Sequence, residues 1–196
     1  LFRQAGVDTV LKELQQLHDQ RVLKPKLASK LSREEKHKAL EYLMFLKKKW
    51  DGTIKGRGCT NGHKQCLYMA KEDVSSPTVA IESVLLTCVI AAAEGRDVAT
   101  VDIPGAFMQA DMDEMVHMRL HGTMAKLIEK IDRGLYTKYI RYKGERPVLY
   151  VELTKALYGT LRAALLFWRK LSQQLVEWGY TVTPYDWCVA NKMVNG

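Results

Sequence analysis

The chain has 196 residues, 47% of them hydrophobic, and its 30 Lys and Arg against 22 Asp and Glu give a formal net charge of +8. This apolar content supports one sizeable core, no linker divides the chain, and the longest apolar run, residues 84–93, is too short to span a bilayer. Four irregularly spaced cysteines indicate free thiols, which argues against a secreted disulfide scaffold. We therefore expect a single intracellular domain, and its positive charge favours a polyanionic partner.

The first third of the chain predicts two helices and a hairpin. Apolar residues recur at helical spacing over residues 6–20, and Ser32 with Glu35 forms a capping box that opens a second helix near Arg33. Tyr42–Lys49 and Thr53–Cys59 flank Asp51-Gly52, a dipeptide suited to a tight hairpin turn.

The middle of the chain predicts a buried helix followed by a buried strand. Ser76-Pro77 is typical of a helix start, Gly95 is placed to end that helix, and Thr78–Glu94 is apolar on nearly all sides. The apolar residues of Asp97–Ile103 predict a strand that Pro104-Gly105 ends.

The last part predicts three strands and a long helix. The strands are Glu114–Leu120, Val148–Leu153 and Trp187–Val194, and the helix is Thr160–Trp178, stopped by Gly179. Strands and helices in mixed order around one sheet predict an α+β fold.

Charge is distributed unevenly. Thirteen basic residues crowd the first third, whereas Asp97–Glu114 is acidic; the basic set is Lys24, Lys26, Lys30, Arg33, Lys36, His37, Lys38, Lys47, Lys48, Lys49, Lys55, Arg57 and Lys64. A basic front before an acidic centre fits a cleft for a nucleic acid and a nucleotide. A solvated lysine-rich surface is the alternative for any single residue.

Two further groups could suggest metal sites. Cys59, His63 and Cys66 offer three zinc ligands, but a structural zinc site needs four and no fourth Cys or His lies nearby in sequence. Asp111, Asp113 and Glu114 are better explained as a solvated turn.

Two motifs carry a family resemblance. Val101-Asp102-Ile103-Pro104-Gly105-Ala106-Phe107 and, further on, Lys155-Ala156-Leu157-Tyr158-Gly159 resemble motifs A and B of the reverse transcriptase of copia-type long-terminal-repeat retrotransposons. Residues 49–58 resemble that family's fingers hairpin, residues 76–79 its helix start, and residues 180–190 a later segment. The resemblance runs from about Leu40 to the end.

The resemblance implies a fingers–palm fragment of a right-hand polymerase, with a mixed, mainly antiparallel palm sheet. Residues 1–196 then form one incomplete domain, with fingers at about 1–75 and 121–157 and palm at about 76–120 and 158–196. The family's third motif, a pair of adjacent aspartates, is expected after Gly196.

The same resemblance assigns the motif A residues. Asp102 is implied as the catalytic ligand of two Mg²⁺ ions, for which Mn²⁺ could substitute, and the carbonyl of Ile103 completes one ion's coordination. The amides of Gly105 and Ala106 approach the triphosphate, and Phe107 blocks a ribose 2′-hydroxyl. A turn-capping role for Asp102 and a core role for Phe107 remain the alternatives.

Other positions complete the implied site. Lys55 and Arg57 hold the triphosphate, and Arg57 is the stronger candidate because its guanidinium offers a planar fork of donors. Tyr158 and Gly159 contact the nucleotide and admit the template, and Arg162 touches template phosphate. The hairpin is shorter than is usual in the family, and the segment Arg162–Leu165 also departs from the family pattern.

Two functions follow from the resemblance. The first is an RNA-directed DNA polymerase fragment that lacks the paired aspartates and is inactive alone. Its partners are a primed RNA or DNA template, deoxynucleoside triphosphates and the rest of a retrotransposon polyprotein, in a cytoplasmic particle or the nucleus, with no membrane partner. The second is a noncatalytic nucleic-acid-binding remnant of a retroelement.

Overall fold

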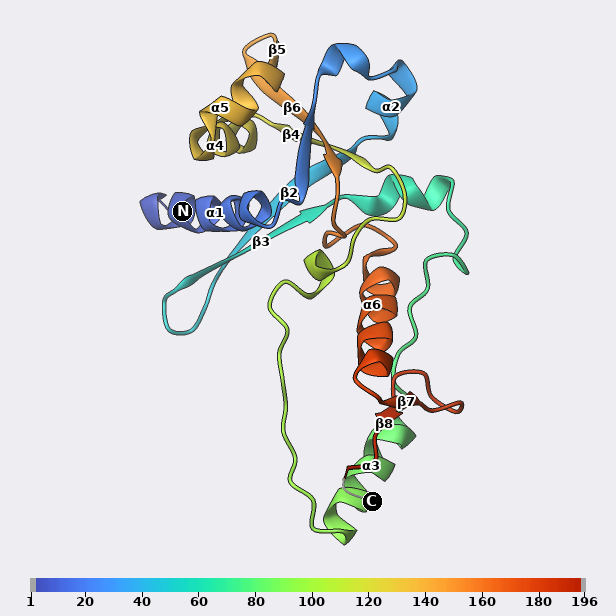
Figure 1. Ribbon diagram of the computed structural model, residues 1–196. Helices are drawn as coiled ribbons and strands as arrows, with labels where there is room; N and C mark the ends of the chain where they lie inside the picture. Colours follow the sequence, from blue (N-terminus) through green and yellow to red (C-terminus); the bar gives the residue numbers. More distant parts are fainter. Residues whose placement is uncertain (1–2, 195–196) are drawn as a thin grey trace.

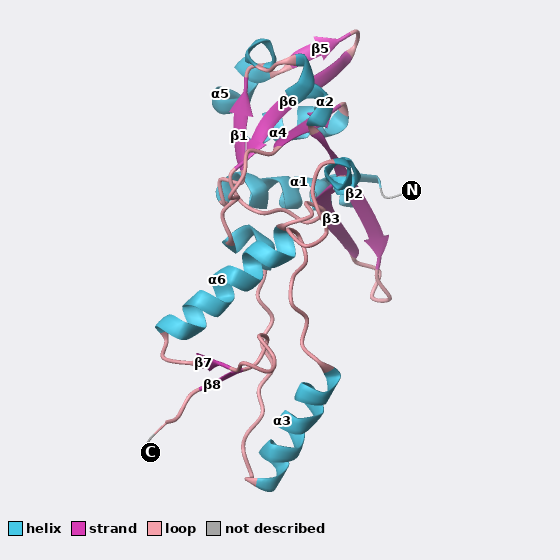
Figure 2. Ribbon diagram, turned by 90° about the vertical axis from the view of Figure 1, so that its right-hand side faces the viewer, coloured by secondary structure: helices cyan, strands magenta, loops and turns pink. Residues whose placement is uncertain are grey.

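A mixed sheet with helices packed around it forms the compact half of the molecule, and a long arm of loops and one helix extends from it (Figures 1 and 2). The computed structural model describes residues 3–194; the outermost residues of the predicted domain lie outside that range. The helices are α1 (Arg3–Asp19), α2 (Arg33–Lys38), α3 (Ile81–Ala93), α4 (Thr123–Ile131), α5 (Arg133–Tyr136) and α6 (Ala163–Glu177), with 3-10 turns η1 (Ala28–Lys30), η2 (Gly62–Leu67), η3 (Ala106–Gln109) and η4 (Thr137–Tyr139). The predicted α+β class is confirmed.

The main sheet has six strands, of which five follow the order β1-β6-β4-β2-β3 and β5 pairs with β6. Their bounds are β1 (Leu23–Lys26), β2 (Leu40–Lys48), β3 (Ile54–Thr60), β4 (His117–His121), β5 (Arg141–Lys143) and β6 (Arg146–Leu153). Only β2 and β4 pair in parallel, so the predicted mixed, mainly antiparallel character is confirmed. Every strand of this sheet but β4 lies in residues that the family resemblance assigns to the fingers.

The core lies between this sheet and the helices α1 and α4. Leu14 of α1 and Ile128 of α4 are fully buried with Leu40, Met118 and Leu149 of the sheet. Burying each such side chain contributes about 1.5–3 kcal/mol. A smaller cluster, which includes Ala110, Ala156, Ala163 and Leu166, seats the start of α6 against η3.

Several local predictions are confirmed. Ser32 and Glu35 form the reciprocal capping box, with Glu35 N–H to Ser32 Oγ at 3.1 Å and Ser32 N–H to Glu35 Oε2 at 2.7 Å. The β2–β3 hairpin turns at Gly52, whose φ is +82°. Gly95 and Gly179, also at positive φ, follow the ends of α3 and α6 as expected.

The predictions for the middle segment are wrong. The helix starts at Ile81 rather than after Ser76-Pro77, and it is exposed: Leu86 is 61% accessible. Asp97–Ile103 forms no strand, and Val101 is 86% accessible. The reason is that no strand in residues 3–194 lies beside this segment to satisfy its backbone, and nothing there covers the helix.

The predicted final strand shrinks to a two-residue β8 (Ala190–Asn191), which pairs only with β7 (Thr181–Val182). Asp186, before β8, accepts a hydrogen bond from the N–H of Ala80 at 2.9 Å and so caps α3. We call residues 74–104 and 179–194 the arm; Figure 2 shows it hanging away from the sheet. No helix in residues 3–194 combines the length and apolarity that crossing a membrane requires.

Candidate functional site

Three distant segments meet where the arm joins the compact half. Arg57 comes from β3, Phe107 from η3, and Tyr158 from the loop after β6. The guanidinium carbon of Arg57 lies 5.5 Å from the ring centroid of Tyr158, and the rings of Tyr158 and Phe107 are 4.4 Å apart. A cation over one ring and a second ring packed beside it form a small charged aromatic wall. Phe107 also contacts Phe167 of α6 at 6.3 Å between centroids.

Two glycines bring this loop against β3. Gly159 has φ +90°, and a Cβ there would lie 1.9 Å from the carbonyl oxygen of Thr60. At Gly62 a Cβ would lie 2.0 Å from the carbonyl oxygen of Gly159. The N–H of Thr60 donates to the carbonyl of Tyr158 at 2.7 Å, which holds the backbone of Tyr158 at the end of β3. The space left by Gly159 is therefore filled by the protein's own backbone.

A cavity of about 180 Å³ opens beside the aromatic wall, between α1 and β3. Four residues singled out from the sequence line it: Lys55, Arg57, Gly105 and Tyr158. The backbone turns at Gly105 with φ +60°, where a Cβ would meet Met108 Cε at 2.9 Å. The volume of the cavity is below the roughly 300–1,000 Å³ of pockets that hold a whole small molecule, so the cavity could hold only part of such a molecule.

Three lining residues with polar side chains were given no role from the sequence, namely Glu13, Gln16 and Tyr42. The hydroxyl of Tyr42 is buried without a hydrogen-bond partner, and burial raises the pKa of this phenol well above its ordinary value. It therefore stays a neutral donor. Glu13 Oε2 accepts from the N–H of Gly58 at 3.2 Å. No sequence signal marks these residues, because Glu13 and Gln16 reach the cavity only through the packing of α1 on β3, and Tyr42 through the pairing of β2 with β3.

Asp102 lies outside the helices and strands of the structure. It is exposed in the irregular segment before Gly105, and Ile103 beside it is 38% accessible. Within residues 3–194, no three or more His, Cys, Asp or Glu side chains are grouped to hold a metal ion. Cys59, His63 and Cys66 therefore do not form such a group in the structure. Two Mg²⁺ ions need several shared oxygen ligands, so the described residues do not fit that pair of ions.

Arg162 is engaged within the protein. Its guanidinium pairs with Asp113 at 2.7 Å, its side chain is only 19% accessible, and Arg169 approaches the same carboxylate at 3.9 Å. Lys155 pairs with Asp111 at 2.7 Å, which lowers the pKa of Asp111. Burial raises the pKa of Glu114, although Arg162 opposes this shift. The acidic turn is solvent-exposed at Asp111 and Asp113, as predicted, and ion pairs tie it to the segment after β6.

Comparison with protein families gives the chain its class. A model of the family described as reverse transcriptase (RNA-dependent DNA polymerase) matches residues 28–192. The chain therefore belongs to the reverse transcriptase family, in its copia-type branch. Comparisons with curated proteins and with solved structures returned no significant match.

Proposed function

We propose that this chain binds the incoming deoxynucleoside triphosphate and the template for RNA-directed DNA synthesis in a copia-type retroelement. The observation that supports it best is the meeting of Arg57, Gly105 and Tyr158 at one cavity, from three segments of the chain. A guanidinium suits phosphate oxygens, a glycine lets a phosphate approach backbone N–H groups, and an aromatic ring packs on a sugar or base.

In this proposal each residue has a role that its chemistry permits. Arg57 and Lys55 hold the triphosphate, and the amides of Gly105 and Ala106 lie along it. Phe107, held against Tyr158, faces the sugar and excludes a 2′-hydroxyl. Tyr158 and Gly159 position the base, and the unpartnered hydroxyl of Tyr42 donates to the part of the nucleotide that enters the cavity.

Catalysis is assigned to Asp102, which with the carbonyl of Ile103 would contribute oxygen ligands to Mg²⁺; such an ion would supply Lewis-acid activation of a hydroxyl. The 196 residues contain no two adjacent aspartates, and the described carboxylates do not complete a two-ion site. We therefore propose that these residues bind substrates without extending a primer by themselves.

The binding step can be tested with calorimetric titration of a deoxynucleoside triphosphate into the chain. Arg57→Ala is expected to weaken affinity about tenfold or more, because charge-assisted hydrogen bonds contribute about 1.5–3 kcal/mol. Arg141→Ala is the matched control, since it removes the same charge from the exposed strand β5. Equal effects of the two substitutions would contradict the nucleotide site.

Primer extension tests the catalytic assignment. No synthesis is expected from the 196-residue chain with Mg²⁺ and a primed RNA. In the retroelement polyprotein that carries this domain, synthesis is expected and should be lost in Asp102→Asn. Activity that survives this substitution would remove Asp102 from the mechanism.

The exposed position of Asp102 favours one second candidate, a nucleic-acid-binding protein without catalysis. It predicts nucleic-acid binding in the chain and no synthesis in the polyprotein. The extension assay above therefore separates the two functions.

A further inference from the structure

One glutamine lies where η2, which follows β3, meets the loop after β6. Gln65 belongs to η2 and is fully buried. Its side-chain oxygen Oε1 accepts a hydrogen bond from the N–H of Leu161 at 3.1 Å. The two residues are 96 positions apart in the sequence, so this bond joins two separate segments of the fold.

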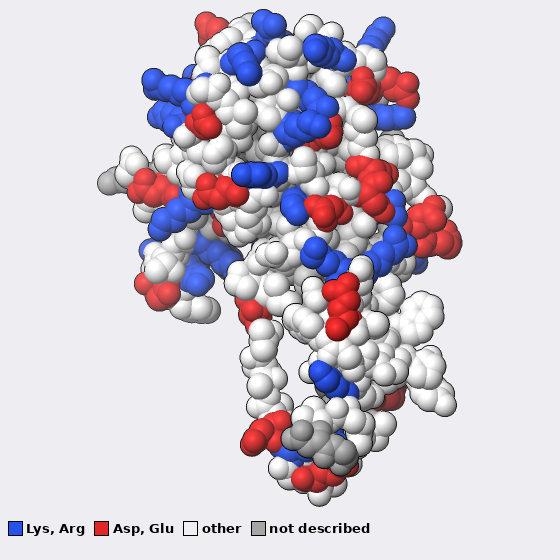
Figure 3. Space-filling view, viewed as in Figure 1, with Lys and Arg blue, Asp and Glu red and all other residues white. Residues whose placement is uncertain are grey.

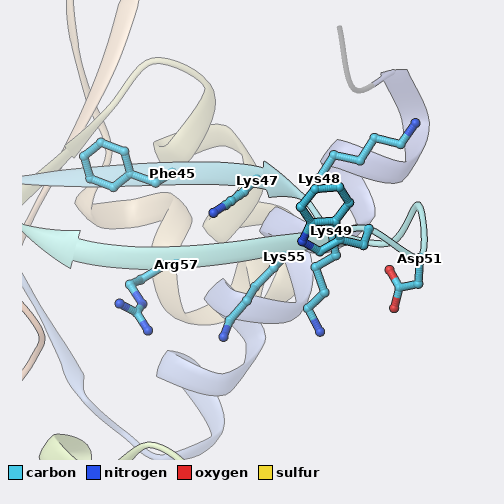
Figure 4. A pocket seen from close by; sticks show the side chains of 8 residues that line it. Phe45, Lys47, Lys48, Lys49, Asp51, Lys55 and Arg57 are labelled. Carbon is cyan, nitrogen blue, oxygen red and sulfur yellow. The ribbon is translucent and has the colours of Figure 1, made fainter.

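The backbone of Gln65 is held on both sides. Figure 4 shows Arg57 toward the end of β3, and the chain then continues into η2. The N–H of Asn61, just before η2, donates to the carbonyl of Glu41 on β2 at 2.8 Å. After η2, the N–H of Tyr68 donates to the carbonyl of Gln65 at 3.1 Å. The glutamine therefore offers its side-chain oxygen from a fixed place beside the sheet.

The loop that this oxygen contacts is held at both ends. We call residues 158–161 the tyrosine loop. At its start, the carbonyl of Tyr158 accepts a hydrogen bond from the N–H of Thr60 at 2.7 Å. At its end, the N–H of Leu161 donates to Gln65. One bond between backbones and one bond from a side chain thus set the place of the tyrosine loop relative to β3.

The position of the loop decides where the ring of Tyr158 lies. That ring is 4.4 Å from the ring of Phe107, between centroids, and 5.5 Å from the guanidinium carbon of Arg57. Binding groups keep a productive geometry only where supporting residues hold them. Gln65 is not among the residues that line the cavity of about 180 Å³, so it acts on the aromatic wall from behind.

The chemistry of the buried amide explains which of its atoms is used. Within residues 3–194, Nε2 of Gln65 has no hydrogen-bond partner. A buried polar group without a partner costs free energy, and an apolar side chain such as methionine would avoid that cost. Such a side chain would leave the N–H of Leu161 without its acceptor. The oxygen is therefore the part of the amide that stabilises the loop.

The lack of charge on Gln65 makes its effect separable from that of the surface. Figure 3 shows Lys and Arg side chains spread over the compact half, where an anionic ligand meets many cations. Gln65 is uncharged and fully buried. A substitution there changes the binding of a charged ligand only through the position of the tyrosine loop.

We propose that Gln65 is a positioning residue for nucleotide binding, because its side-chain oxygen holds the tyrosine loop with the ring of Tyr158 between Arg57 and Phe107. This role rests on the proposed function, since the loop belongs to the proposed nucleotide site. It adds to that site a residue that the nucleotide does not touch.

Calorimetric titration of a deoxynucleoside triphosphate into the 196-residue chain tests this role. Gln65→Met removes the acceptor with little change in volume and should weaken the affinity about fivefold, the equivalent of one neutral hydrogen bond. Gln65→Glu keeps an oxygen for the N–H of Leu161, also in the protonated form that burial favours, so its affinity should stay within about twofold of the parent. Equal affinities of Gln65→Met and the parent, or equal losses in both variants, would overturn the proposal.

Other variants control for stability and folding. Ile128→Val on α4 shortens a fully buried side chain of the core and should lower the melting temperature without changing the affinity. Gln173→Met on the exposed side of α6 removes the same amide and should change neither. Gln65→Asn retracts the amide from Leu161 and should lose affinity as Gln65→Met does, which keeps the test valid if Gln65→Met does not fold. A loss in Ile128→Val as large as in the Gln65 variants would show that affinity only follows stability and would overturn the proposal.

A double-mutant cycle shows whether Gln65 acts through Tyr158. In a Tyr158→Ala background the ring is gone, so Gln65→Met should change the affinity by less than about twofold. A merely structural role predicts independent effects, and a full loss of about fivefold in that background would contradict positioning.

The positioning role and the nucleotide site fail in different ways. No binding of triphosphate to the parent chain would contradict the proposed function and the role of Gln65 with it. Binding that Arg57→Ala weakens and Gln65→Met leaves unchanged would support the nucleotide site and overturn only the positioning role.

Discussion

Strand β6 and helix α3 are both apolar, but Leu149 and Val151 of β6 are fully buried, whereas Leu85 and Leu86 of α3 are about 60% exposed. The strand lies between β1 and β4, and α4 covers it. The helix is held through polar contacts at its start, where Asp186 binds the N–H of Ala80. The comparison shows that an apolar sequence favours burial, but a segment becomes buried only where a neighbouring element packs against it.

The largest expected effect contrasts a leucine in each region. Leu120→Ala on β4 should lower the free energy of unfolding by about 3 kcal/mol, because a fully buried side chain leaves a cavity. Leu86→Ala on α3 should change it by less than about 0.5 kcal/mol, since surface substitutions act weakly. Urea denaturation of both variants measures the difference. A large loss in Leu86→Ala would mean that α3 is covered in solution.

A second pair of variants compares glycines at positive φ. Gly159→Ala should cost about 3 kcal/mol, because left-handed strain adds to a clash with the Thr60 carbonyl. Gly95→Ala has open space around its Cβ and should cost only the strain, about 1 kcal/mol. Thermal unfolding measures both, and equal losses would contradict the close approach at Gly159.

A substitution at Phe107 tests the region where the arm joins the compact half. If Phe107 has the proposed role, Phe107→Val in the proposed polyprotein should raise incorporation of ribonucleotides relative to deoxynucleotides about tenfold, because a smaller side chain would admit the 2′-hydroxyl. Phe167→Val removes a ring that packs on Phe107 and controls for lost packing. An unchanged ratio in primer extension would leave Phe107 as a packing residue.

The smallest expected effect concerns acid and the arm. Hydrogen bonds from the Ser83 hydroxyl and from the N–H groups of Ala80 and Cys188 hold the pKa of Asp186 below its ordinary value. Because the pKa of Asp186 is lower in the folded state, the ionised side chain stabilises the fold at pH values above its unfolded-state pKa, about 3.9. This contribution is lost as the pH falls through the folded-state pKa. The protection factors for hydrogen exchange at the start of α3 should therefore fall below about pH 4, while those in β6 change less. Asp186→Asn should show low protection there at every pH, and protection factors at the start of α3 that do not change with pH in the parent chain would contradict the cap.

The local features of this chain were set by its sequence. The capping box at Ser32, the turn at Gly52 and the helix ends at Gly95 and Gly179 depend on hydrogen bonds and φ angles within a few residues, so they could be predicted. The motif residues Arg57, Gly105 and Tyr158 were also identified from the sequence. Their meeting at one cavity, and the part played there by Tyr42 and Glu13, came from the packing of α1 and the loop after β6 on β3.

Burial was decided only by the tertiary structure. Asp97–Ile103 and Thr78–Glu94 have the apolar pattern of a strand and a core helix, but a strand needs a neighbour for its backbone and a helix needs a surface to cover it. Residues 3–194 provide neither, whereas Val148–Leu153 finds partners more than a hundred residues away in β1. Sequence pattern determines which conformation a segment favours. Contacts between distant segments determine whether it is buried.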